Sequence, residues 1–227
     1  MKKKILFVGN SMTYYNYLPA MVKEIFASVG EDIDVTMVTE PGKCLLFHSS
    51  HKNTSFNILW GDYDVVVLQG VADGFNAETF LEGGQIIHDE FLSKTRSKTV
   101  LYLVWSIKSR PDLQPPMTAA YVELAKRIGA VVSPAGEVWH KILNTRPAPD
   151  IYAPDGNHPN PAGTYLAAST LFYTLSGRRR ALTVKDGEGL HSRLGMSDKT
   201  ARDIQRVACR YAAEYADMAE ANKADKK

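Results

Sequence analysis

Three residues from opposite ends of the chain have the side-chain types that acyl transfer needs. Ser11 lies near the amino terminus, and Asp155 and His158 lie three residues apart in a proline-rich segment. A serine hydroxyl becomes a nucleophile when an imidazole removes its proton, and the imidazole needs a carboxylate that fixes its tautomer. In a turn that enters a helix, residues three apart can face one another. The spacing therefore predicts a catalytic triad of Ser11, His158 and Asp155.

The tetrahedral oxyanion of such a reaction needs hydrogen-bond donors. The backbone N–H groups of Ser11 and Gly42 are suited to supply two of them, and a side-chain amide would supply a third. Each triad residue also has a plainer interpretation when it is taken alone. Ser11 could be a turn serine or a helix N-cap, Asp155 a turn residue, and His158 a helix-entry histidine bonded to the backbone.

Parallel strands joined by crossover helices would position these residues at one edge of a sheet. Short apolar, β-branched segments alternate along the chain with segments of helical spacing. Each strand is expected to be continuously hydrophobic, because helices cover both faces of such a sheet. Ligands bind beyond the carboxyl ends of the strands, where Ser11 and Gly42 fall. The expected strands are residues 5–8, 34–38, 65–68, 99–104 and 130–132.

Apolar residues three and four positions apart predict five helices, with capping residues at several of their ends. Gly129 closes the helix before the fifth strand, and Asn160-Pro161 supplies the N-cap and first residue of the next helix. Gly83-Gly84 weakens another by about 1 kcal/mol per glycine relative to alanine. The expected helices are residues 18–29, 76–93, 117–128, 161–175 and 197–218.

Taken together and in order, the polar blocks after the strands resemble the SGNH or GDSL-type serine hydrolases. Gly9-Asn10-Ser11 resembles the first block of that family, Gly42 its second, Gln69-Gly70 its third, and Asp155-Gly156-Asn157-His158 its Asp-x-x-His. The resemblance covers residues 4–176. It implies an α/β fold, a three-layer α/β/α sandwich with a five-stranded parallel sheet in flavodoxin-like order. It also implies ester hydrolysis without a metal or an organic cofactor.

The third block of the family can be aligned with this chain in two ways. If Gly70-Val71-Ala72-Asp73 is laid on Gly-x-Asn-Asp, the oxyanion asparagine has become Ala72, and a lost donor costs roughly 100- to 1,000-fold in rate. If Gln69-Gly70 is laid on the Gln-Gly-Glu block of the carbohydrate acetylesterase branch, Gln69 supplies the third donor. We favour Gln69 because it directly follows the strand; its plain alternative is a polar cap of the sheet end. This alignment favours O-acetyl groups on carbohydrates as substrates.

The composition of the chain excludes several other functions. Its 227 residues include 27 lysines and arginines and 25 aspartates and glutamates, a net charge of +2. This is too small to make nucleic acid or an anionic membrane the expected partner, and no apolar run reaches the roughly 20 residues of a membrane span. The Gly-x-Gly-x-x-Gly fingerprint of dinucleotide enzymes is absent after the first strand. The expected partner is a small-molecule ester, an acetylated saccharide being favoured. Non-catalytic carbohydrate binding on the same fold is the alternative.

The cysteines and histidines do not form a metal-ligand pattern. Cys44 and Cys209 are too few and too far apart for a metal site or a disulfide framework, so free thiols are expected. Met1 and three lysines precede an apolar run, residues 5–8, that stops at Gly9-Asn10 and is too short for the hydrophobic region of a signal peptide. We therefore expect a cytoplasmic location, with a trimmed leader as the alternative. The histidines outside the triad, expected on the surface or satisfied in the core, are His48, His51, His88, His140 and His191.

The chain divides into a hydrolase domain, residues 1–178, and a C-terminal loop and helix, residues 179–227, expected to pack on the same domain. Ser197 caps the last helix, whose apolar stripe favours core packing, with a homodimer contact as the alternative. Arg178-Arg179-Arg180 is interpreted as charge at a helix end, and a phosphate contact is the alternative.

Two features near the strand ends could shape a substrate pocket. The segments 47–56 and 106–114 are expected to be loops that set the acyl and alcohol specificity. Four aromatic residues could line an acyl or sugar pocket, although packing is the commoner role for such side chains. They are Tyr14, Tyr15, Tyr17 and Trp105.

Overall fold

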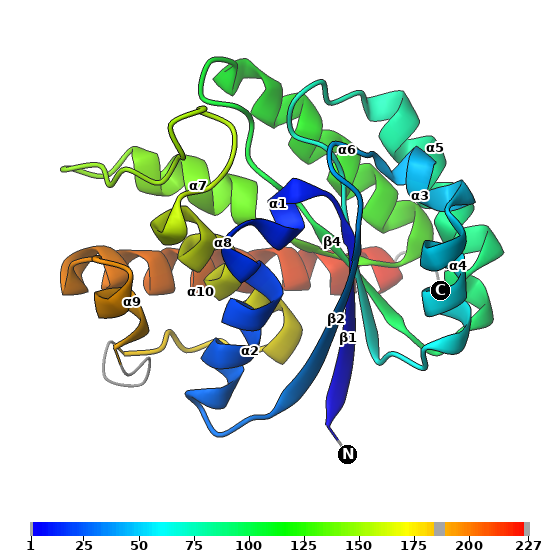
Figure 1. Ribbon diagram of the computed structural model, residues 1–227, viewed down its shortest axis with the longest axis horizontal. Coiled ribbons are helices and arrows are strands. Elements are labelled where there is room, and N and C mark those ends of the chain that lie inside the picture. The colour runs from blue at the N-terminus through cyan, green and yellow to red at the C-terminus, as the bar shows by residue number, and fades with distance from the viewer. Residues whose placement is uncertain (1, 184–188, 225–227) are drawn as a thin grey trace.

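Five parallel strands run through the centre of the molecule, which a computed structural model describes over residues 2–183 and 189–224 (Figure 1). The strands are β1 (Lys3–Gly9), β2 (Ile33–Thr39), β3 (Val65–Gln69), β4 (Lys98–Tyr102) and β5 (Val131–Ser133). Their order is β2-β1-β3-β4-β5, which confirms the expected flavodoxin-like sheet. The winding reverses between β1 and β3, and ligands bind at such a point in open α/β sheets.

Long amphipathic helices cover the sheet, and all five expected helices are present. They are α2 (Leu18–Ala27), α5 (Ala77–Glu90), α6 (Gln114–Ile128), α8 (Pro161–Ser176) and α10 (Asp198–Ala224). α2, α8 and α10 pack together in one layer, and α5 and α6 pack together in the other. The capping residues act as predicted: the Asn160 side chain accepts from the Gly163 N–H, and Gly129 ends α6 with φ 69°.

The expectation of continuous hydrophobicity is wrong for β2. Strand β2 lies at the edge of the sheet, and its neighbours cover it incompletely. Asp34 and Thr36 are exposed, and Met37 keeps 47% of its surface exposed. The central strands β1 and β3, by contrast, are buried over nearly all of their length, as helices on both faces require.

Short helices fill connections that the sequence predicts as loops. The segment 47–56 is largely helical, which corrects the expectation of a loop there, and the segment 106–114 contains the 3₁₀ turn η3 (Pro111–Leu113). Helices this short are marginal in isolation, so packing rather than intrinsic propensity stabilises them. The additional elements near the sheet are α1 (Ser11–Tyr14), η1 (Tyr15–Tyr17), α3 (Leu45–Ser50), α4 (Lys52–Trp60), η2 (Leu92–Lys94), α7 (Ala135–Leu143) and α9 (Leu190–Arg193).

The two glycines in α5 allow close packing of α3 at Gly83 and of α6 at Gly84. A Cβ atom at Gly83 would stand 2.2 Å from the backbone nitrogen of Leu46, and one at Gly84 would stand 2.3 Å from Leu124 Cδ2. The α3 backbone thus comes closer to α5 than any side chain at Gly83 would permit. The packing explains why a helix of this length carries glycines in its middle.

The C-terminal helix α10 packs along α8 and against β5. Its Gln205 amide donates to the Tyr165 hydroxyl at 2.7 Å and to the Ser169 hydroxyl at 3.0 Å, both on α8. Arg179, after α8, forms an ion pair with Asp217 of α10. This ion pair is exposed, so the buried contacts of Gln205 contribute more to holding α10 beside α8.

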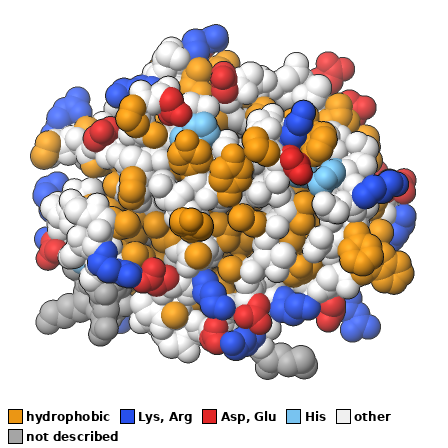
Figure 2. Space-filling model, in the orientation of Figure 1, with side chains coloured by type: hydrophobic (Ala, Val, Ile, Leu, Met, Phe, Trp, Pro, Cys, Tyr) orange, Lys and Arg blue, Asp and Glu red, His pale blue; other side chains and the backbone are white. Residues whose placement is uncertain are grey.

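The surface mixes charges of both signs. On the face in Figure 2, acidic and basic side chains are intermixed, mostly around the rim, and apolar side chains gather toward the middle; the mixture of signs agrees with the small net charge. Both cysteines, Cys44 and Cys209, are free thiols, as expected. Within the two described stretches of chain, no helix combines the length and the apolar character that a membrane span needs.

Candidate active site

The structure brings Ser11, His158 and Asp155 together at the carboxyl edge of the sheet. Ser11 is the first residue of α1, directly beyond β1, and the other two residues lie in the loop before α8. Ser11 Oγ lies 2.8 Å from His158 Nε2, and His158 Nδ1 lies 2.6 Å from Asp155 Oδ2. The unbroken line of hydrogen bonds joins residues 147 positions apart in sequence.

Asp155 both holds its own turn and contacts the imidazole. Its Oδ1 accepts from the backbone N–H groups of Asn157, at 2.9 Å, and His158, at 3.0 Å. The hydrogen bond from His158, and next that from the Asn157 N–H, lower the pKa of Asp155 below its usual value. An ionised carboxylate at this position holds the proton on His158 Nδ1, which leaves Nε2 free to accept from the Ser11 hydroxyl.

The first polar block is fixed by hydrogen bonds of Asn10. Its Oδ1 accepts from the Met12 N–H at 3.0 Å and caps α1, so Asn10 rather than Ser11 is the N-cap. Its Nδ2 donates to the Lys43 carbonyl at 3.0 Å, which holds the Gly42 turn beside Ser11. Gly42 has φ 68°, a backbone conformation that favours glycine.

Two backbone N–H groups are available for an oxyanion. Ser11 and Gly42 both line a cavity of about 480 Å³. Within residues 2–183 and 189–224, neither backbone N–H donates to a protein acceptor. This cavity is lined by Asn10, Ser11, Met12, Tyr14, Tyr15, Pro41, Gly42, Val71, Ala72, Asp73, Asn157 and His158.

Gln69 does not reach this cavity, and the expectation that it supplies the third donor needs correction. The side chain is fully buried, and its Oε1 accepts from the Asn10 N–H and the Thr13 hydroxyl, each at 2.9 Å. Its Nε2 donates to the Gly70 carbonyl. The Gln69 amide therefore holds the segment that carries Ser11 and is not available to the cavity. The cavity wall is instead formed by Val71-Ala72-Asp73, which favours the alignment in which Ala72 replaces the oxyanion asparagine.

A buried histidine that sequence reasoning placed among the scattered ones also supports the nucleophile segment. His48 is fully buried; its Nε2 donates to the Gly9 carbonyl at 2.9 Å, and its Nδ1 accepts from the Thr54 hydroxyl at 2.9 Å. Burial lowers the pKa of His48 and so favours the neutral imidazole that this pairing needs. No signal in the sequence distinguishes His48 from the other histidines.

Asn157 offers a side chain that the protein itself leaves unused. Its backbone is held by Asp155 and by the Trp105 indole N–H, which donates to the Asn157 carbonyl at 3.0 Å. Asn157 is among the residues that line the cavity, and within the described part of the chain its Oδ1 is buried without a partner. From the sequence, only the position of Asn157 inside the Asp-x-x-His block indicates that it lies at the site.

Two of the four aromatic residues line the cavity, one is exposed and one lies in the core. Tyr14 and Tyr15 line the cavity, whereas Tyr17 is 79% exposed. Trp105 is fully buried and stacks on Trp139 at a centroid distance of 3.7 Å, so it has the packing role. Within residues 2–183 and 189–224, no cluster of three histidine, cysteine or acidic side chains is arranged to hold a metal ion.

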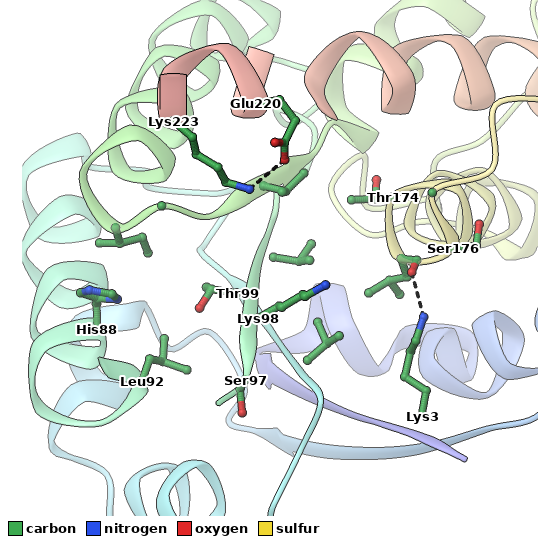
Figure 3. A pocket seen from close by; sticks show the side chains of 17 residues that line it. Lys3, His88, Leu92, Ser97, Lys98, Thr99, Thr174, Ser176, Glu220 and Lys223 are labelled. Carbon is green, nitrogen blue, oxygen red and sulfur yellow. Dashed lines mark hydrogen bonds and ion pairs between the residues drawn. The ribbon is translucent and has the colours of Figure 1, made fainter. Parts of the chain in front are cut away.

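Figure 3 shows a different cavity, of about 600 Å³, where β1 and β4 begin. Lys3 and Lys98 line it from these strands, and the end of α10 borders it. Lys3 Nζ donates to the Leu175 carbonyl at 3.1 Å, and Lys223 pairs with Glu220 at 2.8 Å. The cavity lies at the sheet edge opposite the triad and is separate from it.

Comparisons with known proteins agree with this architecture. No family model matches the chain, and no curated protein matches it at a significant level. Among solved structures, a DUF4886 family protein from Bacteroides uniformis ATCC 8492 is similar, with TM-score 0.69 and 15% identity over 92% of this chain and 94% of that one.

Two esterases of known structure are also similar to this chain in fold, at low sequence identity. The psychrotrophic esterase EstA from Pseudoalteromonas sp. has TM-score 0.60 and 12% identity, over 78% of this chain and 98% of that one. A catalytic mutant of Axe2, an acetylxylan esterase from Geobacillus stearothermophilus, has TM-score 0.58 and 12% identity, over 87% of this chain and 97% of that one. At these identities the likeness shows a shared fold.

Proposed function

Because the chain has the SGNH hydrolase fold, shared with esterases, we propose that it is a serine esterase. The observation that carries the proposal is the continuous hydrogen-bond line from Asp155 through His158 to Ser11. It ends beside a cavity that has two uncommitted backbone donors. The same groups are those that base-activated acyl transfer requires.

The reaction follows from these positions. His158 Nε2 takes the proton of Ser11 as Oγ attacks the ester carbonyl, and Asp155 stabilises the imidazolium that forms. The N–H groups of Ser11 and Gly42 stabilise the oxyanion. His158 then gives its proton to the departing alkoxide, so the alcohol leaves and an acyl-serine remains. Water, activated by the same imidazole, releases the acid and restores the Ser11 hydroxyl.

The proposed oxyanion hole has two backbone donors, and the third block supplies no side-chain donor to it. Ala72 carries no polar group, and the Gln69 amide is bonded elsewhere. Removal of one donor costs roughly 100- to 1,000-fold in other hydrolases. We therefore expect modest turnover of simple aryl esters, with part of the transition-state binding supplied by groups on the natural substrate.

The proposed substrates are short-chain acyl esters, O-acetyl groups on carbohydrates in particular. The polar groups on the cavity wall, Asn157 and Asp73, suit a leaving alcohol with several hydroxyls. An acetylxylan esterase shares the fold, which is consistent with this class. Rates across acyl chain lengths, followed by rates on acetylated saccharides and on their deoxy analogues, test the substrate class.

Substitution of the nucleophile tests the activity itself. Ser11→Ala should lower kcat for an aryl acetate by about 10⁴-fold or more, because the acyl-enzyme can no longer form. The thermal unfolding midpoint should stay close to that of the wild type, since Ser11 has a small, half-buried side chain. Retained turnover in a folded Ser11→Ala protein would remove Ser11 from the mechanism. A wild type that binds saccharides without turnover would favour the alternative of a binding protein.

A further inference from the structure

Two of the three residues that follow α1 have an unusual backbone. Asn16 has φ 49° and Tyr17 has φ 56°, so two successive residues other than glycine are left-handed. Such conformations persist where the surrounding structure holds them, and they concentrate at functional sites. Asparagine is among the few residue types that tolerate this region. The contacts of Tyr15 and Asn16 show what holds the turn.

Asn16 ties the nucleophile segment to the segment that carries the base. Its Nδ2 donates to the Pro159 carbonyl at 3.0 Å and to the Thr164 hydroxyl at 2.8 Å. Pro159 directly follows His158, and Thr164 lies in the first turn of α8. An amide nitrogen has two hydrogens, and here both are used on the His158 side of the site.

Tyr15 covers a face of the catalytic imidazole. Its ring stacks on that of His158, with 4.1 Å between the centroids and 13° between the planes. The two ring nitrogens of the imidazole are already held by Ser11 and Asp155, so its remaining freedom is displacement out of its own plane. Tyr15 blocks that displacement on one side. The ring face also favours the positive charge that His158 gains when it takes the serine proton.

We propose that Tyr15 and Asn16 are positioning residues that set the distance between Ser11 and His158. This inference rests on the proposed function, because the distance matters for activity only if Ser11 reacts. The amide fixes the backbone next to the imidazole, and the tyrosine ring fixes the imidazole plane. Both groups lie within five residues of Ser11 in sequence. The segment that carries the nucleophile therefore also positions the imidazole of His158.

Removal of the Asn16 contacts should lower kcat and leave KM nearly unchanged, since Asn16 is not among the residues that line the cavity. Tyr15 does line the cavity, so the comparison of Tyr15→Ala with Tyr15→Phe, which keeps the ring, carries the test at that position. Misplacement of a reacting group by about 1 Å can cost about 100-fold. We expect a fall in kcat of about 10- to 100-fold for Asn16→Gly, which keeps the left-handed backbone accessible, and for Asn16→Asp. Tyr15→Ala should lose about 10-fold, and Tyr15→Phe should restore the rate, because stacking needs the ring and not the hydroxyl.

Two further variants separate positioning from general stability. Tyr17→Asn alters the other left-handed residue, which is largely exposed, and should leave kcat unchanged. Thr164→Val removes one of the two acceptors of the Asn16 amide, and the changed residue lies in α8. It should lower kcat severalfold while the left-handed residues 16–17 stay unaltered. It serves as the test if Asn16→Gly is poorly folded. Thermal unfolding midpoints are measured for every variant.

The readout is the rate at which a small organophosphonate labels Ser11, together with kcat and KM for an aryl acetate. Slower labelling in the Asn16 and Tyr15→Ala variants, at wild-type folding, supports the proposal. Variants that lose stability but label and turn over at the wild-type rate would show that the contacts are structural only. A wild type that is not labelled would overturn the esterase proposal first, and this inference with it.

Discussion

Asp155 divides its two carboxylate oxygens between the backbone and the imidazole. One oxygen closes the turn through the N–H groups of Asn157 and His158, and the other accepts from the His158 ring. The turn interpretation and the triad interpretation of this residue are therefore compatible. The same contacts keep the carboxylate ionised, because they lower its pKa. A single residue thus fixes both the place and the tautomer of the base.

The pH dependence of activity follows from the protonation states that the base and the carboxylate of the triad need. We expect kcat/KM for an aryl acetate to be lower in acidic solution, because general-base catalysis by an imidazole needs its neutral form. The lowered pKa of Asp155 means that it gains its proton only in more acidic solution than a free aspartate does. It should therefore add no separate step between pH 5 and 8. A flat profile over that range would argue against His158 as the base.

The sequence predicts the triad residues but not the role of the Gln69 side chain. Ser11 and the Asp-x-x-His block are recognisable because their chemistry depends on residue type and local spacing. The role of an amide depends on where it points, and Gln69 points into the protein because Gly9 leaves room for it. A Cβ at Gly9 would stand 2.4 Å from Gln69 Oε1. Such a contact between two strands leaves no pattern along the chain.

Helix α3 connects the second polar block to the first. It begins three residues after Gly42, and its His48 bonds to the carbonyl of Gly9, one residue before Asn10. Gly83 of α5 allows the close approach of α3. The placement of the Gly42 N–H therefore depends on the packing of α3 against α5.

Gly83→Ala tests this packing. The added methyl group gains up to about 1 kcal/mol in helix propensity, but it collides with the α3 backbone, and overpacking costs about 1–3 kcal/mol. We expect the thermal midpoint to fall by about 2–4 °C per kcal/mol of net loss, with lower kcat. Gly84→Ala is the matched control, because its methyl group meets the Leu124 side chain rather than the backbone of a neighbouring helix and should cost less. A Gly83→Ala protein with a raised midpoint and full activity would contradict this role of α3.

The long helices are predictable because each has apolar residues three and four positions apart, several with capping residues at their ends, and the strands are predictable from short apolar runs. The short helices α3 and α4 lack such a pattern: α4 even exposes Phe56 and Trp60, at 66% and 74%. Their order comes from tertiary contacts such as His48 with Gly9. The edge strand β2 differs from the expected apolar run for a similar reason, since its place in the sheet decides its burial.

On the scale of the whole molecule, the parallel sheet is what assembles the site. All five strands present their carboxyl ends to one edge, so residues near positions 10, 42, 72 and 158 meet there. The helix α8, which follows His158, packs against α2, which follows the Ser11 segment. Both ends of the chain must be folded and docked before the serine is activated.

Covalent labelling tests this account most directly. An organophosphonate should form one adduct per chain on the peptide that contains Ser11, and His158→Ala should slow labelling by several orders of magnitude, because only a base-activated serine reacts at a useful rate. The adduct is located by mass spectrometry of the digested protein. Labelling of another residue, or equal labelling of the wild type and His158→Ala, would contradict the account.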